Sequence, residues 1–553
     1  MSTDLDIANS IKLKPITEIA ARIGLSSEDL YQYGPNIAKI SSPVIDESRI
    51  KDSKMILVTA MSPTPAGEGK TVTSIGLAQG LDHIGKKTCV VLREPSLGPV
   101  FGIKGGAAGG GYSQVLPMED INLQFTGDFS AVQTANNLLS AMVDNYAQNR
   151  KARPILDART IKWKRVMDMN DRALRSIMIG LGGITMGVPR ETGFDITAAS
   201  EIMAILCLSN DIEDLKERIG NIYVGQTIDR EPMYARDFKA PGAMAAVLKR
   251  AMLPNLVQTV DGTPAIIHGG PFANIAQGTN TVIATKTGMS LADYVVTEAG
   301  FGADLGAEKF LNIKCRAAGI QPSAAVVVAT VRALKFHGGV EKDNIGNPNP
   351  EAVRKGLVNL QRHVDNMMSY GLPVVVSINR FTTDTQEELD VIKEIKGAPA
   401  VESNVWAEGG KGGAALAEEV VKACELPSKP LNHPYGLNDS PEEKIRAIAT
   451  KIYGAADINI SEQARKDLRR IDRLGCSDLP VCIAKTQYSF SDDPKKLGAP
   501  SDFILNIREV ELAAGAGFLV PITGAIMRMP GLPVSPSAER IDIDSDGNIS
   551  GLF

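Results

Sequence analysis

The chain has 553 residues, of which 44% are hydrophobic and 22% are charged, and its formal net charge is −5. This composition is typical of a soluble globular enzyme, and the length predicts about two to four domains. The acidic balance excludes strong binding to nucleic acid or to an anionic membrane surface, because each of these needs a basic stripe. We therefore expect small-molecule partners, with no nucleic acid and no membrane.

The six cysteines lie far apart, without a C-x-x-C pair. This spacing gives little support to zinc ligation, redox exchange or a disulfide framework, and indicates buried thiols in a reducing cytosol. The first ten residues, MSTDLDIANS, have neither the basic nor the apolar segment of a signal peptide. No stretch approaches the roughly 18 apolar residues of a membrane span, so we expect a cytoplasmic protein.

Short β-branched runs recur along the chain, separated by stretches with helical spacing. The runs are continuously apolar, which is typical of strands buried on both faces of a parallel sheet. Their alternation with helices predicts an α/β fold. The expected strands are 55–60, 88–92, 264–268, 324–331, 373–378 and 480–484. Domain boundaries are expected near 300–320 and near 486–500, where turn residues gather.

The stretch MSPTPAGEGKTVTSIGLAQGL, which begins at Met61, resembles a phosphate-binding loop between a strand and a helix. The first glycine of the usual motif is replaced by Thr64, which a negative φ would permit. We expect backbone N–H groups to surround phosphate oxygens, Lys70 to reach the outer phosphates and Thr71 to ligate Mg²⁺. The predicted nucleotide-binding residues are Thr64, Pro65, Ala66, Gly67, Glu68, Gly69, Lys70 and Thr71.

Arg93 and Glu94 follow the strand at 88–92. Ligands of open α/β sheets bind at the carboxyl ends of strands, so Arg93 is expected beside the phosphates. An arginine there can bind a phosphoryl group or a carboxylate with two donors, and the alternative is an ordinary surface ion pair. Further along, Asp128 is a candidate for binding a cation or a metal-bound water, whereas Glu119 and Asp120 are expected to cap a helix.

These residues leave two classes of protein open. One is a ligase or kinase that acts on a small carboxylate or phosphate acceptor, and the other is a switch ATPase whose nucleotide state controls partner binding. Glycine-rich segments at 102–112, 268–278 and 408–413 favour the enzyme, because such runs indicate backbone close to a ligand or bent into a functional loop.

Several longer motifs carry a resemblance to a known family. TPAGEGKT, VTEAGFGADLGAEKF, INRFTTDT, AKTQYSFSDDP and the terminal MPGLPVSPSAERIDIDSDGNISGLF resemble formate–tetrahydrofolate ligase, and the similarity runs from about residue 10 to the last residue. The resemblance implies that ATP, formate and tetrahydrofolate give 10-formyltetrahydrofolate, ADP and phosphate through formyl phosphate. It also implies a P-loop NTPase-like large domain with a mostly parallel sheet, two smaller α/β domains and a homotetramer.

The resemblance assigns domains and site residues. The implied domains are 1–305 for the nucleotide, 306–485 contributing to the folate site, and 486–553 with a tail that returns to the large domain. Lys70 and Arg93 become catalytic residues in this family pattern. The implied aromatic residues around the pterin are Phe381 and Trp406, and those near an activating monovalent cation, K⁺ or NH₄⁺, are Glu94 and Asp128.

The chain departs from the family pattern at three positions. Gln124, Ser130 and Gln277 stand where the family usually has histidine, whereas His268 is retained. These changes lie near the expected active site and question any step that depends on a histidine. A catalytically impaired paralogue of the ligase is therefore an alternative to a working enzyme. We expect activity, because formate and the N10 amine need no base for attack.

Overall fold

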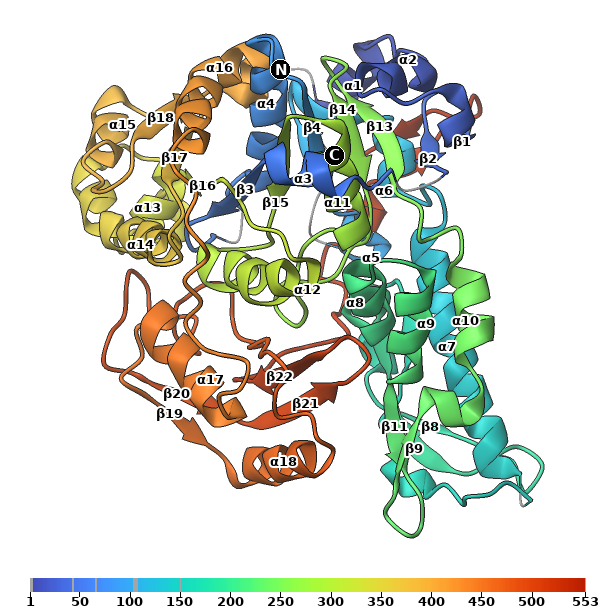
Figure 1. The fold of residues 1–553 in the computed structure, drawn as a ribbon. Coiled ribbons are helices and arrows are strands. Elements are labelled where there is room, and N and C mark those ends of the chain that lie inside the picture. The colour runs from blue at the N-terminus through green and yellow to red at the C-terminus, as the bar shows by residue number, and fades with distance from the viewer. Residues whose placement is uncertain (1–2, 42–43, 65–66, 103–107, 150, 553) are drawn as a thin grey trace.

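The computed structural model describes residues 3–41, 44–64, 67–102, 108–149 and 151–552 (Figure 1). A 12-stranded sheet lies at the centre of this described part. Its strands are β1 (Leu30–Gln32), β2 (Ala38–Ile40), β3 (Lys54–Ala60), β4 (Thr88–Leu92), β5 (Gly109–Gly110), β6 (Ser113–Leu116), β13 (Asn255–Thr259), β14 (Pro264–Ile267), β15 (Tyr294–Glu298), β16 (Ala324–Ala329), β17 (Val374–Asn379) and β18 (Ala400–Ser403).

The strand order is β1-β2-β13-β14-β4-β15-β3-β16-β17-β18, and β6 pairs with both β13 and β5. From β14 to β18 in this order all neighbours are parallel, and the antiparallel pairs lie at the β1 end. The predicted α/β class with a mostly parallel sheet is confirmed. The expected strands 55–60, 88–92, 264–268, 324–331 and 373–378 match β3, β4, β14, β16 and β17 within two residues.

The expected strand at 480–484 is wrong as a strand of this sheet. Val481 and Ala484 form isolated parallel bridges to Leu519 and Ile522 of β22 (Phe518–Ile522), far along the chain from the large sheet. Residues 481–484 lie beside β22 and are fully buried, and full burial gives a continuously apolar sequence in any core. The pattern alone therefore did not reveal its partner.

Successive residues of the central strands face opposite hydrophobic clusters, because side chains alternate along a strand. Met55 and Leu57 of β3 belong to one cluster, whereas Ile56 and Val58 belong to the other. The second cluster includes residues of the helices α4 (Lys70–His83) and α16 (Val405–Cys424). The helices of the described part are α1 (Asp4–Ser10), α2 (Ile16–Arg22), α3 (Glu47–Asp52), α4 (Lys70–His83), α5 (Leu97–Phe101), α6 (Met118–Asn122), α7 (Asp128–Gln148), α8 (Glu201–Leu208), α9 (Ile212–Gly220), α10 (Pro241–Leu248), α11 (Val282–Leu291), α12 (Arg316–Ala318), α13 (Val331–His337), α14 (Pro350–Ser369), α15 (Gln386–Ile392), α16 (Val405–Cys424), α17 (Pro441–Ile448) and α18 (Glu462–Arg473).

Glycines bring α4 and α16 into close contact. A Cβ on Gly80 would lie 2.6 Å from the carbonyl oxygen of Gly413, and one on Gly76 would lie 2.3 Å from Cβ of Val405. The glycine-rich run 408–413 therefore contains a kink of α16 at Gly409, and its Gly410 and Gly413 pack against α4, which differs from the ligand-facing loop expected for it.

Two further groups of elements lie below the sheet in Figure 1. The cyan and green part contains β7 (Arg165–Met167), β8 (Ile177–Ile179), β9 (Arg190–Thr192), β10 (Phe194–Ile196), β11 (Tyr223–Gln226) and β12 (Pro232–Tyr234) beside α7 to α10. The orange and red part contains α17, α18, β19 (Asp457–Ile460), β20 (Ile504–Ile507), β21 (Glu509–Ala513) and β22.

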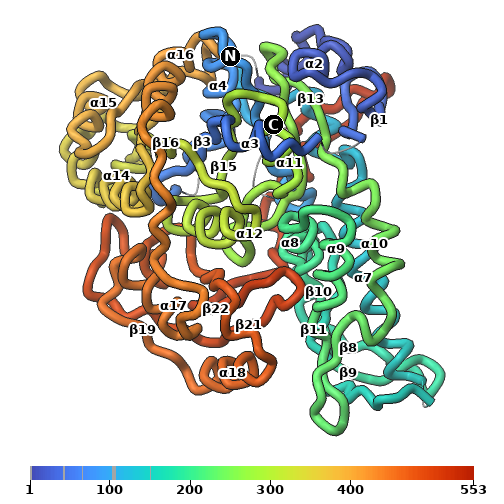
Figure 2. Tube along the Cα trace, viewed as in Figure 1, coloured from blue at the N-terminus to red at the C-terminus, as the bar shows by residue number. Residues whose placement is uncertain are grey.

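The C-terminal tail, with β23 (Asp542–Ile543) and β24 (Ile549–Ser550), runs back to the N-terminal segment, as the red end of the tube beside the blue segment indicates in Figure 2. Leu552 is buried in the same cluster as Leu5 and Ile37. The division into domains at residues 305 and 485 stays a prediction. Strands from both sides of residue 305 belong to the large sheet. Among the described residues, no helix has the length and apolarity to cross a membrane.

Candidate active site

The described residues of the connection from β3 to α4 have backbone features of a phosphate-binding loop. Gly67 and Gly69 have φ values of +80° and +69°, in the left-handed region that favours glycine. Gly69 is the N-cap of α4, so Lys70 and Thr71 begin the helix. The free N–H groups of a helix N-terminus bind anions, so this backbone is compatible with a phosphate site, and the binding of a nucleotide there stays a prediction.

The carboxylate of Glu68 supports this loop from within the protein. Its Oε1 accepts a hydrogen bond of 2.6 Å from the N–H of Thr64, and its Oε2 accepts one from the hydroxyl of Thr330, after β16. Burial raises the pKa of Glu68. Thr64 is not among the described non-glycine residues with positive φ, so it replaces the usual glycine without strain. Pro65 and Ala66 lie outside the described residues.

Asn379, the last residue of β17, contacts the loop from the neighbouring part of the sheet. Its Nδ2 donates a hydrogen bond of 3.3 Å to the carbonyl oxygen of Glu68. A Cβ on Gly69 would lie 2.4 Å from the same nitrogen, so a larger residue at this left-handed position would displace the Asn379 amide. Sequence reasoning used this segment as a family motif and missed its contact with the loop.

A buried carboxylate that sequence reasoning also missed joins the loop to Arg93. Glu298 is the last residue of β15, which lies between β3 and β4. Its Oε2 accepts a hydrogen bond of 2.9 Å from the hydroxyl of Thr71, and its Oε1 lies 3.4 Å from Nη2 of Arg93. The signal available was an acidic residue directly after the strand-forming run YVVT, because functional groups of α/β sheets lie at the carboxyl ends of strands.

Arg93 lies at the carboxyl end of β4, as expected. Its side chain is 23% exposed, and its Nη1 donates a hydrogen bond of 3.2 Å to the carbonyl oxygen of Pro271. The buried Nε has no hydrogen-bond partner within the described part of the chain. Arg93 is thus only partly satisfied by the protein and retains donors for an anion.

Glu94 and Asp128 form a buried acidic pair with Lys39 of β2. Both oxygens of Asp128 accept hydrogen bonds from the Lys39 ammonium, at 2.8 and 2.9 Å, and Asn255 donates to one of them. Burial and the charge of Asp128 raise the pKa of Glu94 well above its usual range. Oε2 of Glu94 is buried without a partner among the described residues.

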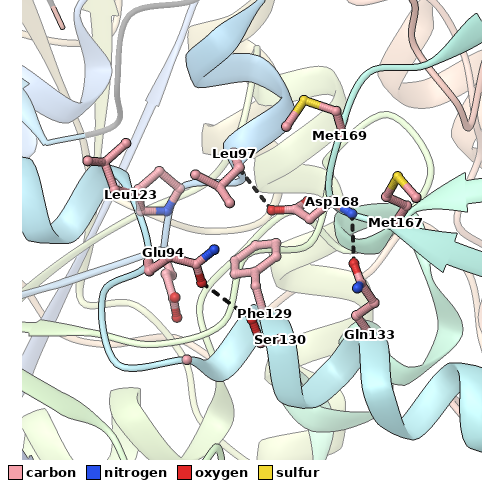
Figure 3. A pocket seen from close by; sticks show the side chains of 12 residues that line it. Glu94, Leu97, Leu123, Phe129, Ser130, Gln133, Met167, Asp168 and Met169 are labelled. Carbon is pink, nitrogen blue, oxygen red and sulfur yellow. Dashed lines mark hydrogen bonds between the residues drawn. The ribbon is translucent and has the colours of Figure 1, made fainter. Parts of the chain in front are cut away.

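A cavity of about 280 Å³ lies beside Glu94 (Figure 3). It contains two of the three positions where this chain departs from the family, because Gln124 and Ser130 line it and their side chains are 3.4 Å apart. Asp168, on the opposite wall, has its pKa raised to about 6 by burial, although it accepts hydrogen bonds from Ser96 and Leu97. The described residues that line the cavity therefore offer amide, hydroxyl and carboxyl groups, and no imidazole is among them.

His268 and Gln277 are both fully buried. His268 shares hydrogen bonds with Thr281 and with the carbonyl oxygen of Ala251, and burial lowers its pKa to about 4. It is therefore a neutral structural residue at physiological pH. Gln277 donates to the carbonyl oxygen of Ala204 at 3.4 Å, and its Oε1 has no partner among the described residues.

Phe381 follows β17 and is half-buried. The guanidinium carbon of Arg332 lies 4.3 Å from the centroid of its ring, so one face of the ring is covered by a cation. The N–H of Phe381 donates to Asp384 at 2.8 Å, which fixes the turn after Asn379.

Trp406, the second residue of α16, is 38% exposed and packs against Gly110 and Gly111, in the glycine-rich segment 102–112. Its carbonyl oxygen accepts a hydrogen bond of 2.8 Å from the N–H of Tyr112. A Cβ on Gly111 would lie 2.8 Å from two atoms of the indole ring. The glycines before Tyr112 thus let the backbone lie against the ring and fix its orientation.

The mostly parallel sheet and the loop at the start of α4 define an α/β protein of the phosphate-loop class. The sequence model of the formate–tetrahydrofolate ligase family matches residues 2–553. The chain belongs to this family of ATP-dependent ligases of one-carbon metabolism, and the resemblance drawn from its motifs is confirmed.

Proposed function

We propose that this chain joins formate to tetrahydrofolate by consuming ATP, through a formyl phosphate intermediate. The observation that carries the proposal is the shared carboxylate of Glu298, which lies within hydrogen-bond distance of Thr71 in the loop and near Arg93. A nucleotide at the loop would therefore present its terminal phosphate toward the side of Arg93. This is the geometry that phosphoryl transfer to a small carboxylate requires.

In the first step a formate oxygen attacks the γ-phosphorus, an O–P bond forms, and the bond to ADP breaks. Lys70 and the N–H groups of the loop stabilise the charge on the transferring group, and Arg93 binds oxygens of formate and then of formyl phosphate. Bound Mg²⁺ would supply charge neutralisation between the phosphates. The hydroxyl of Thr71 and the carboxylate of Glu298 fit it, since both are hard oxygen donors.

In the second step the N10 amine of tetrahydrofolate attacks the formyl carbon, and phosphate leaves. The released phosphate or water takes the proton that N10 loses. We assign Phe381 and Trp406 to the pterin, because flat rings bind a planar heterocycle with few rotatable bonds to order. For a monovalent cation, K⁺ or NH₄⁺, the unpartnered oxygen of Glu94 fits best, with Asp128 beside it.

The assignment of the two aromatic residues predicts a selective effect on folate. Phe381→Ala or Trp406→Ala should raise the KM for tetrahydrofolate more than the KM for ATP, since stacking contributes about 0.5–1.5 kcal/mol beyond buried area. Initial rates at varied concentrations of each substrate measure this. Trp163→Ala is a matched control in a packed region of the fold. An equal rise in both KM values in the site variants would assign them to folding or to the nucleotide.

The replacement of family histidines leads to a prediction of activity. Formate is an anion at neutral pH and N10 is neutral, so neither attack needs a base. General acid–base help contributes about 10²–10⁴-fold, and its absence would slow the reaction without abolishing it. The purified protein should form 10-formyltetrahydrofolate from formate. If only the Gln124→His/Ser130→His double variant turns over, the chain is the impaired paralogue.

The same assay separates the ligase from a switch ATPase. ADP release is measured with formate, with tetrahydrofolate and with both. The ligase requires turnover that depends on both substrates. Hydrolysis that ignores both and responds to a protein partner would instead identify a switch ATPase.

We also propose a cytoplasmic homotetramer, with domains 1–305, 306–485 and 486–553. The hairpin of β8 and β9 supports the assembly, because it carries a cluster of exposed apolar side chains, which often marks an interface. These are Met178, Leu181, Ile184 and Met186, exposed by 55%, 63%, 69% and 63%.

The double variant Leu181→Asp/Ile184→Asp should lower the native mass from that of a tetramer, because buried carboxylates would oppose association. Light scattering after size exclusion measures the mass. Leu426→Asp changes a comparably exposed leucine elsewhere and should leave the mass unchanged. A tetramer that survives the double variant would rule out the hairpin as an essential interface.

A further inference from the structure

Glu298 occupies a place where it acts on two functional residues at once. β15 pairs with β3 on one side and with β4 on the other, so its last residue lies between the phosphate loop and Arg93. One carboxylate oxygen accepts a hydrogen bond of 2.9 Å from the Thr71 hydroxyl, and the other lies 3.4 Å from Nη2 of Arg93. The side chain of Glu298 is only 4% exposed, so water screens these interactions poorly.

The contact with Thr71 orients the hydroxyl for a metal. Since its proton is donated to Glu298, the lone pairs of Oγ1 face away from the carboxylate and remain for a cation. A hydroxyl of this kind, held by an acidic residue from a neighbouring strand, is a feature of magnesium sites in phosphate-loop proteins. Glu298 is thus connected to the nucleotide half of the site.

The same carboxylate of Glu298 also contacts Arg93, the residue proposed to bind the anionic substrate. The distance of 3.4 Å is long for a charged hydrogen bond, and Nε of Arg93 has no partner among the described residues. Glu298 therefore offsets part of the charge of Arg93 without occupying all its donors. When a divalent cation also balances Glu298, Arg93 has more positive potential for an anion.

We propose that Glu298 is a positioning residue that makes binding of the magnesium nucleotide and of the anion at Arg93 cooperative. The inference rests on the proposed function, because it takes Thr71 as a nucleotide residue and Arg93 as an anion residue. Thermodynamic reciprocity requires that each ligand strengthens the other by the same factor. Glu298 would then favour occupation of both subsites together.

Calorimetric titration tests this with ADP and inorganic phosphate as probes. ADP is titrated with Mg²⁺ and with a chelator, and phosphate is titrated with and without saturating Mg·ADP. The coupling is the Kd for phosphate without Mg·ADP divided by the Kd for phosphate with saturating Mg·ADP. In Glu298→Gln this ratio should be lower than in the wild type by at least about fivefold, which is the lower end of typical coupling. The Kd for ADP without Mg²⁺ should stay close to the wild-type value, because the N–H groups of the loop are unchanged.

Glu394→Gln is the matched control, since Glu394 pairs with Arg354 in an exposed ion pair, and it should keep the wild-type ratio. If Glu298→Gln does not fold, Thr71→Val tests the same coupling by removing the hydroxyl from the other end. Thr71→Ser should restore it. An unchanged ratio in the folded variant overturns the proposal, as does an equal loss of ADP binding with and without Mg²⁺.

These titrations need no turnover. A protein that lacks formate-dependent activity yet retains the coupling would refute the proposed function and leave this inference intact. An active ligase without the coupling would do the reverse.

Discussion

Replacing Lys70 with alanine is expected to lower kcat for formate-dependent ADP release by about 10²–10³-fold at saturating ATP. Lys70 is the first residue of α4, directly after the N-cap Gly69. Its side chain therefore starts at the N-terminus of the helix, where the phosphates are proposed to bind. Its loss removes one charged donor from a transition state whose charge is spread over three oxygens. Single-turnover measurement of ADP formation reports the chemical step.

The control for this variant is Lys355→Ala, which removes a lysine from an exposed pair with Glu351 on α14. That change should leave kcat unchanged, because exposed pairs contribute little. A rate close to that of the wild type in Lys70→Ala would show that the loop has no catalytic role. The unfolding temperature of both variants separates catalysis from stability.

The local parts of this fold are readable from the sequence because their causes are local. Strands buried on both faces have continuously apolar sequences, which is why β3, β4, β14, β16 and β17 were predicted. The phosphate loop was equally visible, since its glycines lie within a few residues of Lys70. The family motifs are also short continuous segments of the sequence, so the family could be identified from them without knowledge of the fold.

The contacts that complete the site join residues far apart in the chain. Thr71 and Glu298 are separated by 227 positions, and Lys39 and Asp128 by 89. They meet because β15 inserts between β3 and β4 and because β2 joins the sheet through β13, and strand order is not encoded in periodicity. Glu298, Asn379 and Lys39 were missed for this reason.

For two features, the contacts in the structure differ from the role that the local sequence suggested. The glycines at 408–413 resemble a ligand loop in sequence, but they allow α4 and α16 to approach each other. Phe381 was expected to offer an aromatic surface, and Arg332 covers one face of it. In both cases the deciding partner comes from another element, so the residue type alone did not specify the role.

Arg93→Lys is expected to lower formate-dependent turnover by about 10²-fold or more, although the charge is kept. In the structure Nη1 of Arg93 contacts the carbonyl oxygen of Pro271, while Nη2 lies near Glu298. A lysine ammonium has one nitrogen and does not reproduce this planar fork, which can also bind two oxygens of formyl phosphate. The Kd for Mg·ATP should stay close to the wild-type value, and calorimetry measures it separately from the rate.

The pattern of losses in Arg93→Lys decides which ligand the arginine serves. If turnover falls and Mg·ATP binding survives, the fork acts on formate and on the acyl phosphate, as proposed. If both fall together, Arg93 holds Glu298 and, through it, the hydroxyl of Thr71, because the same carboxylate contacts both residues. Arg354→Lys, in an exposed pair with Glu394, supplies the matched control, and both properties should remain unchanged there.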